Sequence, residues 1–518
     1  MSKSSTRTYQ TRAIRGFEAP LAAYATLMGH VEHCLLADIL AGKIAKDLKS
    51  SYLTRFQITA RQFNATRVKL EGKIESTLQL MSVRMETKKL QIESLEKVLH
   101  KIKNKKTLHQ KKRRLAQLKH QLKNLEIARK DKKISLCFGS RKLFSAQFNL
   151  QKNGYKSHEE WKKQWQESRA SEIFILGSKD ESSGNQSCTA TIAEDHSISL
   201  RIRLPNVLVP LYGKYLVIPH MRFAYGHEEI VAAIHQCQLK DKKTPAQAIT
   251  FRFKQDSKGW RVFVTTDISL PQPITHSGNG TIGVDINSCH LAVIESDRFG
   301  NLISSHTMPL PLQGTSKEQT KALIGNASAQ IIALCEKKKK PLILEHLDFK
   351  KKKAALREQN PSYARMLSSF AYSTILTHLK SRGATRGIEV HTVNPAFTSL
   401  IGRVKFAKRY GITLHTAAAL CISRRFLGVS ERMPQGQRDI PDGKGGCVTL
   451  DLPARNRSGH VWLQWGQLNR NLRAALTAHF RAVKTDPRAP LKTALVTAKL
   501  SDFAGGTPAR QSPTPLLC

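Results

Sequence analysis

A long stretch without glycine or proline is the strongest constraint on how this chain can fold. Residues 73–138 contain neither residue and consist mainly of Lys, Leu, Glu, Gln and Arg. These residues favour the α-helix because they lose little side-chain freedom in it. Apolar residues at helical spacing form two strips, Leu95, Leu99 and Ile102 in the first and Leu115, Leu118, Leu122 and Leu125 in the second. The stretch therefore predicts an antiparallel pair of helices.

Basic residues gather between the two strips. The first strip is followed by Lys103, Lys105 and Lys106, and then by Lys111, Lys112, Arg113 and Arg114. One interpretation is a coiled-coil spacer with solvated charged faces. The other is an arm that contacts a nucleic-acid backbone. We favour the arm because the whole chain has 84 Lys and Arg against 39 Asp and Glu, a net charge of +45 that is typical of proteins with a polyanionic partner.

The composition also limits the class of protein. A chain of 518 residues with 40% hydrophobic residues can fold into several domains. We expect no membrane partner, because no apolar run reaches the roughly 18 residues that a membrane-spanning helix needs. The nine cysteines are isolated and none are spaced as C-x-x-C, which argues against both a disulfide framework and a thiolate zinc site.

The hydrophobic period divides the chain into segments. We expect residues 1–20 to supply an edge strand to a β-domain and residues 21–133 to form a basic helical lobe. The period then changes to two, which predicts an antiparallel barrel or sandwich over residues 134–270, with Arg201, Arg203, Arg252 and Lys254 facing outward. A second domain follows over residues 281–483. We expect the Pro-, Thr- and Ala-rich tail, 484–518, to be disordered.

Two short apolar strands of the second domain each carry an acidic residue. In the first, Thr281 to Asn287, alternation places Asp285 on the side opposite Ile282, Val284 and Ile286. Two further strands joined by a turn follow, and the second acidic strand ends with Glu345. A carboxylate fixed in a strand can hold Mg²⁺, which needs few protein ligands. An acid in an apolar strand can equally be an ordinary hydrogen-bonded residue, so each is a candidate only.

The order of these pieces resembles the TnpB family. The resemblance rests on Gly-Val-Asp-x-Asn at Asp285, Leu-Glu-x-Leu at Glu345 and Asn394-Pro-x-x-Thr398-Ser before an Ala-rich helix. It is specific over residues 281–431 and extends to the N-terminal half only in architecture. TnpB proteins are accessory proteins of bacterial insertion sequences and relatives of the type V CRISPR effectors.

This resemblance implies an α+β multidomain protein. It would have a helical N-terminal lobe, a small antiparallel β-barrel of the wedge type, and a C-terminal RuvC-like domain with a mixed α/β ribonuclease-H fold. Family members use a guide RNA from the mobile element to find double-stranded DNA and cut it with Mg²⁺, or Mn²⁺ in its place. A separate transposase is a further expected partner, and the expected location is cytoplasmic and nucleoid-associated. Asp285 matches the first catalytic Asp of the family, and Glu345 matches its catalytic Glu.

The sequence departs from the family pattern twice. The family's paired cysteines are missing between Leu400 and Leu414, so we expect no zinc. His415 stands where the third catalytic Asp normally opens the Ala-rich helix, a form that a branch of TnpB-related proteins shares. A neutral imidazole at a helix N-terminus can bind a metal or take a proton from water, which makes His415 a candidate catalytic and metal-binding residue. The alternatives are a packing role and an inert replacement in a protein that binds RNA and DNA without cutting.

Further residues complete the set of candidates. Asp348, Asp439 or Asp442 could replace the missing acid, whereas Glu295 and Asp297 are expected to be surface turn residues. Basic residues expected to contact phosphates are, besides those of the arm, Lys350, Lys351, Lys352 and Lys353 in a loop and Arg424 and Arg425 on the Ala-rich helix. Two alternatives to an RNA-guided endonuclease remain open: a nuclease-dead RNA-guided DNA-binding protein, and a structural protein that only shields a transcript.

Overall fold

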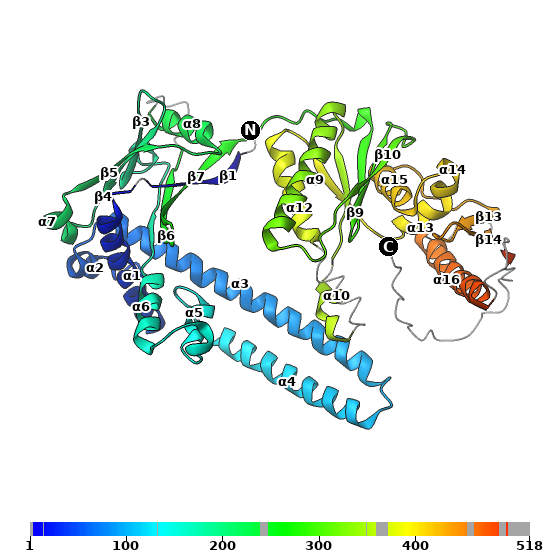
Figure 1. Cartoon of the computed structure of the whole chain (residues 1–518), viewed down its shortest axis with the longest axis horizontal. Coiled ribbons are helices and arrows are strands. Elements are labelled where there is room, and N and C mark those ends of the chain that lie inside the picture. The colour runs from blue at the N-terminus through cyan, green and yellow to red at the C-terminus, as the bar shows by residue number, and fades with distance from the viewer. Residues whose placement is uncertain are drawn as a thin grey trace. The chain divides into compact units, whose positions relative to one another are not determined.

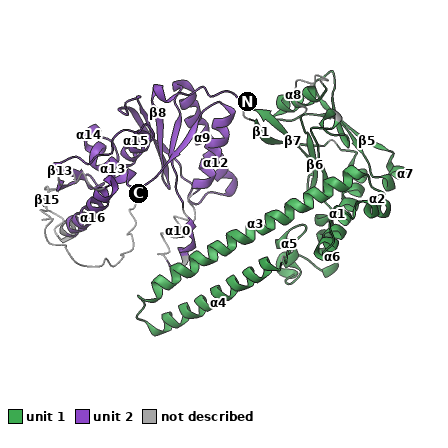
Figure 2. Ribbon diagram, turned by 180° about the vertical axis from the view of Figure 1, so that it is seen from behind, with its two compact units in different colours: residues 1–269 green, residues 270–518 purple. Residues whose placement is uncertain are grey.

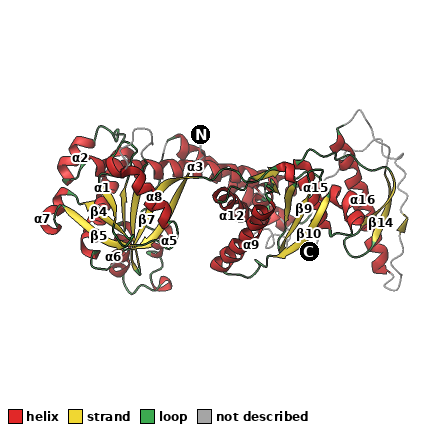
Figure 3. Ribbon diagram, turned by 90° about the horizontal axis from the view of Figure 1, so that it is seen from above, coloured by secondary structure: helices red, strands yellow, loops and turns green. Residues whose placement is uncertain are grey.

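The computed structural model describes residues 4–13, 15–131, 133–238, 247–348, 350–358, 371–452, 460–485 and 494–495. The chain divides into two compact units, residues 1–269 and 270–518 (Figure 2). Each unit combines helices with sheets, so the architecture is mixed α and β (Figure 3). None of the described helices is long and apolar enough to cross a membrane.

Two long helices, α3 (Ala60–Leu99) and α4 (Lys105–Lys130), form the predicted antiparallel pair (Figure 1). Thr59 and Gln62 begin α3 with reciprocal hydrogen bonds to each other's backbone, and Asn104 begins α4 by accepting from a backbone N–H. Leu95 and Leu118, one from each apolar strip, are buried. The predicted pair is confirmed, but it is shorter than the stretch, because α4 ends at Lys130.

The other α-helices of unit 1 are shorter than these two and accompany two antiparallel sheets. The helices are α1 (Glu18–Leu40), α2 (Lys49–Phe56), α5 (Arg141–Ala146), α6 (His158–Arg169), α7 (Val209–Tyr212) and α8 (His227–Gln238). One sheet has the order β1 (Ser4–Arg12), β7 (Gly259–Ser269), β6 (Thr250–Asp256) and β2 (Glu172–Ile175). The other contains β3 (Cys188–Ile192), β4 (Ile198–Arg203) and β5 (Tyr215–Met221).

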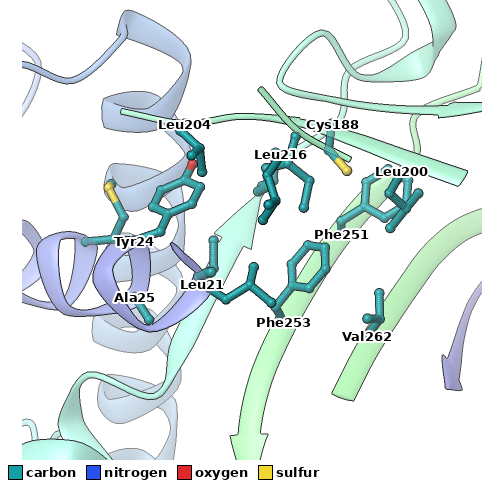
Figure 4. Close-up of a cluster of buried hydrophobic side chains, with 14 of the residues drawn as sticks. Leu21, Tyr24, Ala25, Cys188, Leu200, Leu204, Leu216, Phe251, Phe253 and Val262 are labelled. Atoms are coloured by element: carbon teal, nitrogen blue, oxygen red, sulfur yellow. The ribbon is translucent and has the colours of Figure 1, made fainter. Parts of the chain in front are cut away.

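The expected β-barrel is wrong, because neither of these sheets closes on itself. The two sheets instead contribute side chains to one hydrophobic core, which also includes helix α1. Figure 4 shows Leu200 and Leu216 from the second sheet close to Phe251 and Phe253 from the first, with Tyr24 of α1 beside them. Alternation along a strand identifies a buried face but does not tell whether the sheet closes or packs on another sheet.

Unit 2 is built on a five-stranded mixed sheet. Its order is β10 (Leu302–Pro309), β9 (His290–Ser296), β8 (Thr281–Ile286), β11 (Leu342–Glu345) and β12 (Val390–Val393). The first three strands are antiparallel, and β8, β11 and β12 are parallel. Helices α9 (Lys317–Lys338) and α12 (Tyr372–Thr385) pack on one face, where Ile282, Val284 and Ile286 are buried. Helix α15 (Leu414–Phe426) packs on the other face.

A smaller group of elements follows the sheet. It comprises α13 (Thr398–Gly402), a π-helical turn (Arg403–Ala407), α14 (Lys408–Tyr410), the hairpin of β13 (Gly436–Pro441) and β14 (Cys447–Leu452), and α16 (Val461–Thr485). These elements share a core with α15 in which Trp465 is fully buried. Most of the tail expected to be disordered, 484–518, lies outside the described residues. Its part Ala494–Leu495 forms β15, which pairs with β14.

Candidate active site

Asp285 lies near the end of the central strand β8, on the face covered by α15. Gly283 identifies this face, since a Cβ added to it would lie 2.4 Å from the backbone oxygen of Ala419 in α15. Only glycine lets the helix approach the strand so closely. Asp285 is two residues further along and is 8% exposed. The amide of Asn287 donates a hydrogen bond of 3.0 Å to its Oδ2 atom and fixes the carboxylate.

Glu345 ends the neighbouring parallel strand β11. The register pairs Ile343 with Gly283, so its continuation brings Glu345 beside Asp285 on the same face. Neighbouring strands are separated by roughly 4.8 Å, which places two carboxyl groups side by side. Glu345 is 8% exposed. Burial raises its pKa from 4.5 to about 7; a hydrogen bond from Thr398 opposes this rise, and the charge of Asp285 adds to it.

The segment after β12 holds Glu345 in place. The hydroxyl group of Thr398 donates to Oε1 of Glu345, and the hydroxyl group of Tyr372 donates to its backbone oxygen. Arg425 donates to the backbone oxygens of Asn394 and Ala396, the latter at 2.8 Å, and so fixes the start of this segment. The sequence identified the segment through the family resemblance, but nothing in its pattern indicated that Thr398 contacts the acid.

His415 lies at the start of α15, where Thr413 is the N-cap residue. It is one helical turn before Ala419, the residue that covers Gly283, and therefore faces the same part of the sheet. Its Nδ1 atom is 3.3 Å from Oδ2 of Asp285, and its side chain is 44% exposed. The structure thus brings His415 directly to Asp285.

A second histidine that the sequence analysis did not single out borders this pair. The ring of His290, at the start of β9, meets that of His415 edge to face with the centroids 4.8 Å apart. Burial lowers the pKa of His290, and the positive charge of a protonated His415 lowers it further, whereas Asp285 raises it. A lone histidine in a strand pattern gives no signal of such a contact.

The carboxylate pair fits Mg²⁺ better than the complete predicted ligand set does. Two desolvated carboxyl groups side by side favour a cation, and Mg²⁺ binds through one or two carboxylates while keeping several waters. The described residues include no group of three or more His, Cys, Asp or Glu side chains placed to hold one metal ion. The expected three-ligand set of Asp285, Glu345 and His415 is therefore not assembled as such, and His415 contacts an acid instead.

The other acidic candidates have separate partners. Asp348 accepts a hydrogen bond of 2.9 Å from the backbone N–H of Lys350. Asp439 pairs with Lys408 at 2.6 Å and with Thr449 at 2.7 Å. Asp442, which is buried, lies 3.4 Å from Nε2 of His479. Each of these three acids thus has a partner outside the pair formed by Asp285 and Glu345.

The expectation that Glu295 is a surface turn residue is wrong. It is 5% exposed and forms an ion pair of 2.7 Å with the buried Lys340, which comes just before β11. This pairing depends on a contact across the sheet that local sequence does not show. Asp297 does lie in the turn between β9 and β10, where it accepts hydrogen bonds from backbone N–H groups.

The basic candidates occupy three places in the fold. Lys111, Lys112, Arg113 and Arg114 are on α4, and Lys112 and Arg113 are exposed. Helix α10 (Lys350–Ala354) begins with Lys350, Lys351, Lys352 and Lys353, so the prediction of a loop here is wrong. The helix forms because Asp348 accepts a hydrogen bond from the backbone N–H of Lys350 and because Lys and Ala have high helix propensity.

Arg424 and Arg425 have partners inside the protein. Arg424 donates to the backbone oxygen of Gly300 at 2.5 Å and lies over the ring of Phe406. Arg425 pairs with Glu431 at 2.5 Å in addition to its contacts with the segment after β12. Packing within unit 2 therefore accounts for both guanidinium groups, and we assign neither to a nucleic-acid interface.

Comparison with known proteins finds similarity among solved structures. No protein-family model matches the chain, and no curated protein matches it. A solved structure titled "T. thermophilus RuvC in complex with Holliday junction substrate" is similar over 28% of this chain and 88% of its own, with 14% sequence identity and a TM-score of 0.20. A TM-score this low does not establish a fold.

Proposed function

We propose that this chain is a metal-dependent endonuclease with a RuvC-like, ribonuclease-H-type domain. The observation that carries the proposal is the pair of buried carboxyl groups, Asp285 and Glu345, at the ends of adjacent parallel strands. The ring of His415 contacts the carboxyl group of Asp285. The sheet has three antiparallel strands followed in sequence by two parallel ones, and the acids lie on the first of these strands, β8, and on the fourth, β11. The family resemblance implies this arrangement.

The residues of the site divide into three tasks. Asp285 and Glu345 would hold the Mg²⁺ ion, or Mn²⁺ in its place, which when bound supplies Lewis acidity toward a phosphodiester. Asn287 and Thr398 orient the two carboxyl groups through their hydrogen bonds. His415 keeps Nδ1 toward Asp285, and its Nε2 atom can accept a proton from an attacking water or deliver one to a leaving oxygen.

The finer proposal is an RNA-guided DNA endonuclease of the TnpB type. It is supported by the sequence resemblance over residues 281–431 and by the net charge of +45. The proposed partners are a guide RNA from the mobile element, a double-stranded DNA target and a separate transposase. The exposed basic residues of α4 and the lysines that begin α10 would contact phosphates without reading the sequence.

A second candidate is a protein that binds a guide and its DNA target but does not cut. It is favoured by the histidine in place of the third acid and by the lack, among the described residues, of a three-ligand metal group. Such a protein would act as a repressor or a transposition accessory.

Cleavage of a plasmid library tests both candidates. The protein would be expressed with its flanking DNA and supplied with Mg²⁺, and wild type would be compared with Asp285→Ala and His415→Ala. The nuclease proposal predicts cutting that both substitutions abolish. Guided binding without cutting by wild type would support the second candidate, and RNA binding without any DNA targeting would indicate a transcript-shielding protein.

A further inference from the structure

The outer face of the three-stranded sheet in unit 1 exposes apolar and aromatic side chains. Register pairs Arg201 with Val217 and Arg203 with Tyr215, while their neighbours Ile202 and Leu216 point into the core. Tyr215 is 38% exposed and Val217 is 51% exposed. A sheet face that meets only water usually carries polar residues at alternate positions, whereas here an aromatic ring and methyl groups lie next to each other on one strand.

Positive charge surrounds the ring of Tyr215. The guanidinium group of Arg201 lies 3.7 Å from its centroid, and the ammonium group of Lys214 lies 5.7 Å from it. The sequence from His196 to Gly226 contains no Asp or Glu. This face therefore combines an exposed aromatic ring with cations that its own segment does not neutralise.

Arg201 differs from the other arginines of the two sheets in its partners. Arg203 donates at 2.5 Å to the side chain of Asn206, and Arg252 on the other sheet pairs with Glu172 at 3.8 Å. The guanidinium of Arg201 makes no hydrogen bond or ion pair with any residue in the described ranges, and it lies over the Tyr215 ring. Its hydrogen-bond donors therefore remain available to an anionic partner.

Two occupants of this face, and the alternative that it has none, can be compared. A cation over an aromatic ring at an exposed site stabilises a fold by only about 0.5–1 kcal/mol, which does not explain the unpaired donors or the exposed Val217. A protein partner would need acidic groups and offers no particular match to a flat ring. An unpaired stretch of nucleic acid supplies both phosphates for the cations and a free base to stack on the ring, whereas duplex bases are already stacked.

We infer that the face formed by Arg201, Lys214, Tyr215 and Val217 binds an unpaired segment of a nucleic-acid strand. One base stacks on Tyr215, and the adjacent phosphates contact Arg201 and Lys214. This goes beyond the proposed function, which assigns the basic surfaces to phosphate contacts alone. It does not depend on cleavage, because none of these residues belongs to the candidate active site.

Binding of labelled oligonucleotides to the full chain tests the inference. The Asp285→Ala background removes cleavage, so that failure of the nuclease proposal leaves the result interpretable. Oligouridine, oligothymidine and an RNA duplex of equal length would be titrated at a salt concentration that weakens phosphate-only binding. Tyr215→Leu is expected to weaken single-strand binding by roughly five- to a hundredfold and to leave duplex binding nearly unchanged.

Matched variants separate stacking from other effects. Tyr215→Phe keeps the ring and should retain the affinity, and Arg201→Gln should weaken binding without altering the core. Tyr225→Leu removes an aromatic side chain that is 85% exposed and should change nothing. A 5-iodouridine oligonucleotide should cross-link within residues 201–217, and the oligouridine and oligothymidine arms tell whether the strand is RNA or DNA.

Three results would overturn the inference. The first is equal single-strand affinity in Tyr215→Leu and its parent, and the second is cross-linking confined to other parts of the chain. An equal loss in Tyr215→Leu and Tyr225→Leu would also contradict it, because the effect would then not belong to this face.

Discussion

Replacement of Glu345 by Gln should stabilise the protein in the absence of metal. The glutamine keeps the shape of the side chain and an oxygen that accepts the hydrogen bond from Thr398, but it removes the charge buried beside Asp285. In the unfolded chain Glu345 ionises with an ordinary pKa near 4.5, and in the folded chain it ionises only near 7. Ionisation therefore costs stability, and the cost grows as pH rises through this window.

The size of the effect can be worked out from the two pKa values. A rise from 4.5 to about 7 corresponds to about 3 kcal/mol at about 1.4 kcal/mol per unit, and it is fully expressed above the higher value. The variant should thus exceed wild type in free energy of unfolding by about 3 kcal/mol near pH 8 and by under about 1 kcal/mol near pH 5. Mg²⁺ should narrow the gap at the higher pH, because it binds the two carboxylates of the wild type.

Hydrogen exchange of peptides from β8 and β11 measures the opening free energy of this sheet directly. Glu336→Gln is the control, since that side chain is 40% exposed in the same unit and its loss should change stability by less than about 0.5 kcal/mol. The reasoning fails if Glu345→Gln is no more stable than wild type near pH 8, or if its advantage is the same at both pH values.

Two further substitutions test the packing that builds the site. Gly283→Ala should destabilise unit 2 by about 1–3 kcal/mol in urea unfolding, because the new Cβ would meet the backbone of α15. Gly325→Ala in α9 is the control: its new Cβ meets nothing within 4 Å, so this variant should be more stable than wild type by up to about 1 kcal/mol. Lys340→Met should lower the free energy of unfolding by about 3 kcal/mol, because it leaves the buried Glu295 only one lysine partner. The Lys340 ion pair helps hold the pKa of Glu295 low, so the loss of stability should shrink as pH falls and that carboxylate is protonated. A loss of stability that does not depend on pH would contradict the assignment.

Local pattern explains which parts of the fold could be predicted. Residues 73–99 and 105–130 form the expected helices because neither Gly nor Pro interrupts them, and β8 forms because Ile282, Val284 and Ile286 alternate with residues that face α15. The two acids are candidates from sequence because each ends or nearly ends an apolar strand. Their position side by side depends on β8 and β11 being parallel neighbours, which is a tertiary property that the family resemblance alone supplied.

The features that could not be predicted depend on contacts between distant segments. Thr398 and Glu345 are far apart in sequence, and so are Lys340 and Glu295, so no window of residues reveals either pairing. Period-two strands are compatible with a closed barrel, but closure is decided by which edges pair, and the described sheets remain open. The charge of the lysines after Asp348 favours a loop, but their high helix propensity outweighs it.

Mg²⁺-dependent cutting of a plasmid library by the co-expressed protein and its flanking RNA is the most direct test of the account. Wild type should cut, while Asp285→Ala should bind its target with the wild-type affinity and leave the DNA intact. Cutting retained in Asp285→Ala, with Mg²⁺ still required, would show that the acid pair on β8 and β11 is not the active site.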